Sequence, residues 1–266
     1  MGFRSKDFIA GIAARCGYRL EPIRRDVGAA DALPSEPYAA MRELMDRLGH
    51  ASPVVFDVGA NKGDTAALFR GMFPGSTVHA FEPFPETIAM LRERFGGDDA
   101  VRIVEAAVSR EAGRATFHVN HAHATNSLLA RPEESERFYP KNAGPKGEIE
   151  VATISLDDYC DAQGIERVAL LKLDIQGGEL MAIGGAQRLL GEGRVDVVYS
   201  EIQFVELYEG AAQFDQVWGE MRRLGYWLFD VYDLHRSAGG QLLYGDAMFV
   251  SADCRERVLR KLRVDR

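Results

Sequence analysis

Residues 54–65, with the sequence VVFDVGANKGDT, constrain the fold more than any other stretch of this chain of 266 residues. The run VVF follows Pro53 and is β-branched and aromatic, which is typical of a short buried strand. Small and turn-forming residues come next, and the apolar residues 66–69 then begin a helix. A strand, a glycine turn and a helix in this order form the first unit of a nucleotide-binding α/β sheet.

The glycine turn has the spacing Asp57-x-Gly59-x-x-x-Gly63. It differs from the G-x-G-x-x-G turn of dinucleotide-binding folds, because Asn61 stands where the middle glycine would be. Glycine lacks a Cβ atom, so a ligand can lie directly against the backbone of such a turn. We therefore expect a ligand that has no pyrophosphate group.

A second acidic residue stands where a ribose would need one. The expected strand at residues 77–81 ends at Glu82, which lies 19 residues after Gly63 and is followed by Pro83. Nucleotide-binding folds place a ribose-binding carboxylate near this spacing. Because a carboxylate accepts hydrogen bonds from both ribose hydroxyls, the turn and Glu82 together predict a nucleoside site.

Two further expected strands, at residues 168–173 and 195–200, also end at acidic residues, Asp174 and Glu201. In an open parallel sheet, ligands bind in the crevice outside the carboxyl ends of the strands. Several acidic groups around one crevice are costly unless they meet hydroxyls, cations or a metal. The alternative is that some of them only cap the helices that follow.

The rest of the chain alternates strands and helices, which predicts a mostly parallel sheet with right-handed crossovers. Residues 120–148 are polar and are expected to form a long connection that is either functional or disordered. The expected helices are 64–72, 85–95, 156–163, 179–190 and 212–224. The further expected strands are 101–106, 115–119, 151–155, 226–231 and 247–251. A loop at 232–246 is expected to join the last two strands.

Residues 1–50 are expected to form an N-terminal helical cap, and residues 51–266 the ligand-binding domain. Residues 38–48 place Met41, Leu44 and further apolar side chains on one face of a helix that ends at Gly49. The structural interpretation is a cap packed on the sheet. The alternative is a lid or a dimer contact, and the dimer contact would make the protein a homodimer.

The formal net charge of −8 and the lack of a long basic run argue against a nucleic-acid or anionic-membrane partner. The short basic stretches, Arg24–Arg25 and 255–266, are interpreted as solvated helix faces. No apolar run approaches the roughly 20 residues that a membrane-spanning helix needs. The three cysteines lie far apart, which predicts a reducing, cytoplasmic location without a disulfide framework or a zinc site.

Five segments resemble the FkbM-type family of S-adenosylmethionine-dependent methyltransferases. They are FDVGANKGDT at 56–65, HAFEPFPET at 79–87, TISLDDY at 153–159, LLKLDIQGGELMAIGGA at 170–186 and YSEIQF at 199–204. One departure is Gln176, where the family usually carries glutamate. The resemblance implies a class I methyltransferase (Rossmann-like) α/β fold: a mostly parallel seven-stranded sheet with helices on both faces and a C-terminal antiparallel hairpin.

The same resemblance implies S-adenosylmethionine as the cofactor, and it places the Asn126–Ser127 turn near the cofactor and the acceptor. Asp57 has a second interpretation, in which it only braces the glycine turn. The residues expected to bind the cofactor are Asp57, Gly59, Ala60, Asn61, Gly63, Thr65, Glu82, Pro83, Ala106, Ser127 and Asp174.

The implied reaction is an in-line displacement, in which an acceptor oxygen attacks the sulfonium methyl group. Alignment of the reactants can be worth roughly 7–11 kcal/mol. An alcohol acceptor also needs a base, for which Asp174, His121, His123 and His235 are candidates. The histidines have a plainer interpretation as exposed loop residues. The late tyrosines Tyr208 and Tyr232 are candidate acceptor contacts.

Asp174 and Glu201 are also candidate ligands of a divalent cation such as Mg²⁺, which binds through oxygen atoms. A cation beside an acceptor hydroxyl would lower its pKa and orient it. The predicted function is O-methylation of a sugar, a glycan or a natural-product small molecule. The alternatives are an NAD-dependent oxidoreductase, which Asn61 disfavours, and a non-catalytic cofactor-binding module, which Glu82 and Asp174 disfavour.

Overall fold

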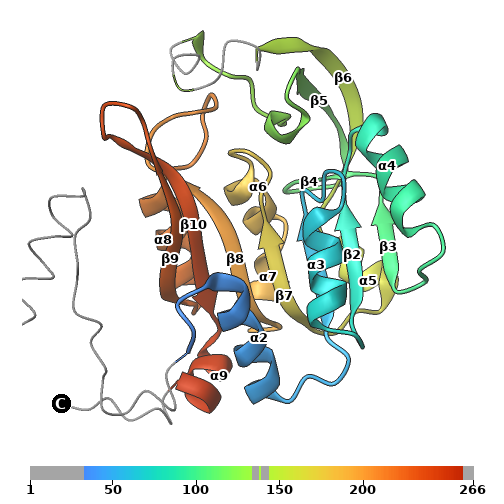
Figure 1. Ribbon diagram of the computed structural model, residues 1–266, viewed down its shortest axis with the longest axis vertical. Helices are drawn as coiled ribbons and strands as arrows, with labels where there is room; N and C mark the ends of the chain where they lie inside the picture. The colour runs from blue at the N-terminus through green and yellow to red at the C-terminus, as the bar shows by residue number, and fades with distance from the viewer. Residues whose placement is uncertain (1–32, 134–137, 139–143, 260–266) are drawn as a thin grey trace, which may run out of the picture. The chain divides into compact units, whose positions relative to one another are not determined.

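A seven-stranded sheet forms the centre of the computed structural model, which describes residues 33–133, 138 and 144–259 (Figure 1). The basic pair at 24–25 and part of the predicted cap lie outside these residues. The strands of this sheet are β1 (Val54–Val58), β2 (Thr77–Phe81), β3 (Val101–Val104), β7 (Val168–Leu173), β8 (Val195–Gln203), β9 (Trp227–Arg236) and β10 (Leu242–Val250).

The order of the strands across the sheet is β3-β2-β1-β7-β8-β10-β9. The first five run parallel to one another, and β10 lies antiparallel between β8 and β9. The order reverses between β1 and β7, so a crevice opens at their carboxyl ends. The predicted fold class, with its C-terminal antiparallel hairpin, is confirmed.

Helices cover both faces of the sheet, because side chains of each strand point alternately to the two sides. Val55 belongs to the core under α2, α3, α4 and α9, whereas Phe56 belongs to the core under α5 to α8. β7 is buried along its whole length, as its apolar sequence predicts. The helices are α2 (Pro37–Leu48), α3 (Asp64–Met72), α4 (Pro85–Phe95), α5 (Leu156–Gln163), α6 (Glu179–Gly184), α7 (Gln187–Gly191), α8 (Phe214–Arg223) and α9 (Ala252–Cys254).

α2 is the described part of the predicted cap. Glu36 caps its first turn by accepting hydrogen bonds from the next backbone N–H groups, and Gly49 ends it in the left-handed conformation. Met41 and Leu44 are fully buried in the core that α2 shares with the sheet. Within the described residues, no helix is long and apolar enough to cross a membrane.

Several boundaries differ from the prediction. The prediction of a loop at 232–246 is wrong, because β9 and β10 cover most of these residues. β9 is the edge strand and most of it is exposed, so its sequence DLHR lacks an apolar pattern. The expected helix 179–190 breaks into α6 and α7 at Gly185, where a Cβ atom would lie 2.1 Å from the Ser109 carbonyl oxygen. The expected strand 101–106 ends at Val104.

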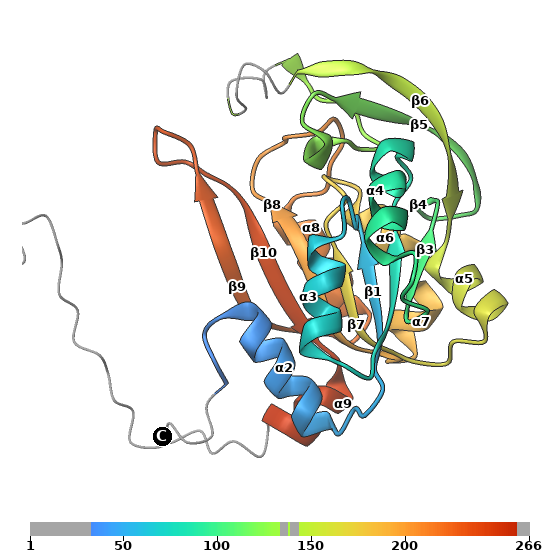
Figure 2. The same cartoon turned by 45° about the vertical axis from the view of Figure 1, so that its right-hand side comes forward.

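A second, three-stranded sheet lies beyond the carboxyl ends of the main strands (Figure 2). β4 (Ala107–Val108) pairs parallel with β6 (Pro145–Ile154), and β6 pairs antiparallel with β5 (Gly113–Asn120). The strands predicted at 115–119 and 151–155 are parts of β5 and β6. The connection between them includes the short 3₁₀ helix η1 (His123–Thr125), so that segment faces the crevice of the main sheet.

Candidate active site

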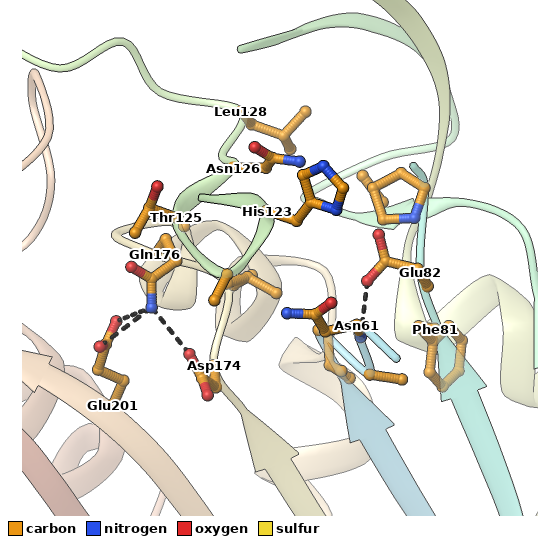
Figure 3. A pocket seen from close by; sticks show the side chains of 18 of the residues that line it. Asn61, Phe81, Glu82, His123, Thr125, Asn126, Leu128, Asp174, Gln176 and Glu201 are labelled. Carbon is orange, nitrogen blue, oxygen red and sulfur yellow. Dashed lines mark hydrogen bonds between the residues drawn. The ribbon is translucent and has the colours of Figure 1, made fainter. Parts of the chain in front are cut away.

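A cavity of about 590 Å³ opens at the carboxyl ends of β1, β2, β7 and β8 (Figure 3). The segment around η1 and residues of the small sheet, such as Val108 and Phe117, line its other side. This volume lies in the range of small-molecule sites. The cavity therefore stands where the topology predicts a ligand.

The glycine turn is pressed against the connection that follows β7. Gly59 has a φ of +82°, and a Cβ atom there would lie 1.9 Å from the Asp174 carbonyl oxygen. Asn61 also adopts the left-handed conformation, and its backbone N–H donates to the Glu82 carboxylate at 2.8 Å. The turn after β1 is thus bound to the ends of both neighbouring strands.

Glu82 presents a buried carboxylate to the cavity. Its two oxygens accept hydrogen bonds from the backbone N–H groups of Asn61 and Phe84, the latter at 3.0 Å. Burial raises the pKa of Glu82, and these N–H groups partly offset that rise. Each oxygen keeps a lone pair for a ligand hydroxyl.

Asp57 lies beneath the cavity and does not line it. It is fully buried, and Lys172 Nζ stands 3.0 Å from its Oδ1 atom, 3.6 Å from Asp174 Oδ2 and 3.2 Å from the Gly59 carbonyl oxygen. Burial alone would lower the pKa of Lys172, but the two carboxylates raise it well above its usual value. This geometry favours the bracing interpretation of Asp57.

Asp174 and Glu201 lie side by side, and the side chain of Gln176 joins them (Figure 3). Gln176 Nε2 stands 2.9 Å from Asp174 Oδ1 and 3.1 Å from both carboxylate oxygens of Glu201. The Tyr208 hydroxyl donates to Gln176 Oε1 at 2.7 Å. Tyr208 and Tyr232, the candidate acceptor contacts, are both buried, and neither lines the cavity.

The carboxyl groups around Asp174 hold their protons more tightly than usual. Burial and the nearby Asp174 carboxylate raise the pKa of Glu201 well above its ordinary range. Burial raises the pKa of Glu179 to about 7, and burial together with Asp174 raises that of Asp246 to about 7. Crowded acids of this kind are typical of functional sites.

The raised pKa of Asp246 predicts a pH-dependent stability. The unfolded chain loses this proton near pH 3.8 and the folded chain near pH 7, so the native state binds more protons in between. The free energy of unfolding of the protein should therefore fall as the pH rises from 5 to 8. In Asp246→Asn, urea unfolding should show a fall smaller by about 2–3 kcal/mol. An equal fall in both proteins would contradict this pKa.

One of the three candidate histidines reaches the cavity. His123 lines it, with Nε2 at 3.3 Å from Glu86 Oε2 and its ring against Phe84. His121 is exposed and lies outside the lining. His235 is also exposed, and its ring stacks on Tyr244, which does line the cavity. The proton-accepting roles of all three stay predictions.

Most of the predicted cofactor contacts come together. Gly63 is instead the N-cap of α3, with Phe95 against it. The buried Ser127 hydroxyl donates to the Gln176 carbonyl oxygen at 2.8 Å. The predicted residues that line the cavity are Gly59, Ala60, Asn61, Thr65, Glu82, Pro83, Ala106 and Asp174. Their roles in binding remain predictions.

Sequence analysis missed Lys172 as a polar group of the site, and it placed Asn126 only in a turn near the cofactor and the acceptor. Lys172 is the single charge in the apolar strand VALLKL, which is a signal that could have found it. The buried Asn126 side chain lines the cavity; its Oδ1 accepts from the backbone N–H of Asn120 at 2.7 Å, and its Nδ2 has no partner among the described residues. A buried donor without a partner is available to a ligand.

Two carboxylates, those of Asp174 and Glu201, make up the candidate cation site. No group of three or more histidine, cysteine, aspartate or glutamate side chains in the described part of the chain could hold a metal ion. Asp174 and Glu201 do lie together, but the amide nitrogen of Gln176 points at both. A hydrogen-bond donor does not coordinate a cation.

The sheet order, the reversed C-terminal hairpin and a carboxylate at the end of β2 define the chain as a class I methyltransferase. The model of the methyltransferase FkbM domain matches residues 57–228, and the chain belongs to this family. The cofactor is S-adenosylmethionine. The oxidoreductase alternative is therefore dropped.

Curated relatives agree with this assignment. The 2-O-methyltransferase NoeI of Sinorhizobium fredii is 32% identical over 185 residues, which cover 66% of this chain and 74% of the relative. The 31-O-demethyl-FK506 methyltransferase FkbM of Streptomyces tacrolimicus is 33% identical over 158 residues, 50% of this chain and 59% of the relative. The methyltransferase sdnD of Sordaria araneosa is 28% identical over 158 residues, 51% and 61% of the two chains.

Proposed function

We propose that this protein transfers a methyl group from S-adenosylmethionine to a hydroxyl oxygen of a sugar, a glycan or a natural-product small molecule. The observation that carries the proposal is one cavity with the Glu82 carboxylate on one side and the Asp174 carboxylate on the other (Figure 3). The names of two relatives state an oxygen acceptor, which supports the same reaction.

The residues of the cavity fit the cofactor. Glu82 would accept hydrogen bonds from the ribose hydroxyls, and the unpartnered Asn126 Nδ2 atom would donate to the ligand. The apolar side chains of Val108, Phe117 and Leu128 offer a surface on which an adenine ring can pack. When bound, S-adenosylmethionine supplies a methyl group on a positively charged sulfur.

Asp174 is the base that we assign to the reaction. It lines the cavity, and its side chain is 44% exposed, so an acceptor hydroxyl can reach it. Gln176 holds its Oδ1 atom from one side, and Lys172 keeps a positive charge near its Oδ2 atom. Asp174 would accept the hydroxyl proton as the oxygen attacks, a contribution of about 10²–10⁴ in rate.

The acceptor would enter next to Asp174 and Glu201. Leu207, Leu243 and Tyr244 line this part of the wall, which is therefore mostly apolar and aromatic. Such a surface packs well against the apolar face of a sugar ring or of a polyketide ring. The carboxyl groups nearby would accept hydrogen bonds from the acceptor's other hydroxyls.

An acceptor screen tests this proposal. The full-length protein would be incubated with S-adenosylmethionine and a panel of monosaccharides, oligosaccharides and hydroxylated polyketides, with S-adenosylhomocysteine formation as the readout. We expect one of these classes to be O-methylated, and NMR of the product locates the methyl group. Methylation at nitrogen or carbon would contradict the proposal. Cofactor binding without turnover across the panel would favour the non-catalytic module.

Two further predictions concern the cellular location and the oligomeric state of the protein. The described cysteines, Cys160 and Cys254, are buried, and the reducing, cytoplasmic location stays a prediction. The homodimer expected as an alternative role of the cap can be checked by light scattering of the full-length protein. A monomer would exclude the dimer contact and leave the cap as a structural element or a lid.

A further inference from the structure

We propose that the side-chain amide of Gln176 takes the place of a divalent cation between Asp174 and Glu201. In this role Gln176 is a positioning residue, because it holds the Asp174 carboxylate beside the acceptor without a metal. The positioning role rests on the proposed methyl transfer, whereas the exclusion of a cation does not.

The contacts of Gln176 support this substitution. An amide NH₂ group has two hydrogens, and Nε2 uses them at 2.9 Å from Asp174 and at 3.1 Å from both oxygens of Glu201 (Figure 3). A cation that joined the two carboxylates would need the same space. The amide brings two donors to the acids without adding a charge.

The other end of this amide contacts a buried tyrosine hydroxyl, which fits the same orientation. The hydroxyl of the fully buried Tyr208 lies 2.7 Å from Gln176 Oε1 and 3.2 Å from the Thr125 carbonyl oxygen. The hydroxyl donates to Oε1 in this arrangement, which leaves Nε2 facing the acids. A flipped amide would point Oε1 at the two carboxyl groups, which is favourable only if a cation lies between them or a protonated carboxyl group donates to Oε1. An amide with Nε2 facing the two acids and a cation between the same acids therefore exclude each other.

The backbone conformation of Gln176 indicates that its side chain has a role of its own. Its φ is +58°, a left-handed conformation that is costly for a residue with a Cβ atom. The Ser127 hydroxyl holds the carbonyl oxygen of Gln176 at 2.8 Å in this conformation. Glycine would adopt the same backbone without strain, so a purely structural turn would not need glutamine here.

Mn²⁺ binding measured by electron paramagnetic resonance tests the exclusion of a cation directly. The full-length protein, saturated with S-adenosylhomocysteine, would be titrated with Mn²⁺ alone and compared with Gln176→Glu. That variant supplies a third carboxylate in place of the amide. We expect wild type to leave Mn²⁺ free and Gln176→Glu to bind it at least tenfold more tightly. Wild-type binding as tight as that of the variant would overturn the proposal.

Turnover tests the positioning role. With an acceptor from the screen, wild-type kcat should be unchanged by EDTA or Mg²⁺, whereas Gln176→Glu should gain activity when Mg²⁺ is added. Gln176→Gly relieves the backbone strain but removes the donors, so its kcat should fall at least tenfold with S-adenosylhomocysteine affinity preserved. Full turnover in the glycine variant would show that only the backbone of Gln176 matters. Because the Mn²⁺ titration needs no acceptor, failure of methyl transfer and failure of this inference can be told apart.

Discussion

Replacement of Asp174 by asparagine is expected to lower kcat by about 10²–10⁴-fold. Asparagine keeps the shape of the side chain and an oxygen that can accept from Gln176 Nε2, so the local structure should survive. It loses the carboxylate that would take the proton of the acceptor hydroxyl. The affinity for S-adenosylhomocysteine, measured by isothermal titration, should therefore change little.

The control for this variant is the same exchange at an exposed aspartate away from the cavity. Asp161 on α5 pairs with Arg188 at the surface, and Asp161→Asn should retain wild-type kcat. Both variants would be compared at saturating cofactor and acceptor. Wild-type turnover in Asp174→Asn would remove Asp174 from the chemistry and return attention to His123.

The exchange Lys172→Met is expected to lower the free energy of unfolding by about 3–5 kcal/mol, because it leaves the buried carboxyl group of Asp57 without its charged partner. Asp57 is fully buried, and Lys172 is the cation nearest to it, at 3.0 Å. Burial already raises the pKa of Asp57, and removal of the ammonium would raise it further. Urea unfolding at pH 7 measures the loss.

A double variant separates the charge effect from lost packing. Lys172→Met combined with Asp57→Asn removes the unpartnered carboxyl group, so it should recover a large part of the stability lost in Lys172→Met. Lys62→Met is the control, since the exposed pair of Lys62 and Asp64 should contribute at most about 1 kcal/mol. The single variants Lys172→Met and Asp57→Asn each lose some free energy of unfolding. A loss in the double variant equal to the sum of these two losses would show that Asp57 and Lys172 do not stabilise each other.

The parts of the fold that rest on local patterns were predictable from the sequence. The run VVF, the glycine turn and the helix after it stand next to one another in the chain, so their residue types suffice to predict β1, the turn and α3. The carboxylate of Glu82 was predictable for the same reason, because its spacing from Gly63 follows from one strand and one helix.

Other features depend on residues that are distant in the chain. Gln176 and Tyr208 lie 32 positions apart, and no spacing rule connects the glutamine of one loop with the tyrosine of another. The pairing of Lys172 with Asp57 requires β1 and β7 to be neighbours, which the alternation of elements leaves open. The outer strand β9 was missed beyond residue 231 because its exposed side chains follow no apolar alternation.

Isothermal titration of the full-length protein with S-adenosylhomocysteine tests the central claim most directly, and Glu82→Gln is the matched variant. Wild type should bind with a micromolar Kd. The variant keeps the size of the side chain but loses its charge and one acceptor, so its Kd should rise by about 10–100-fold. No binding by the wild-type protein, or an equal Kd in Glu82→Gln, would contradict the assignment of this cavity to the cofactor.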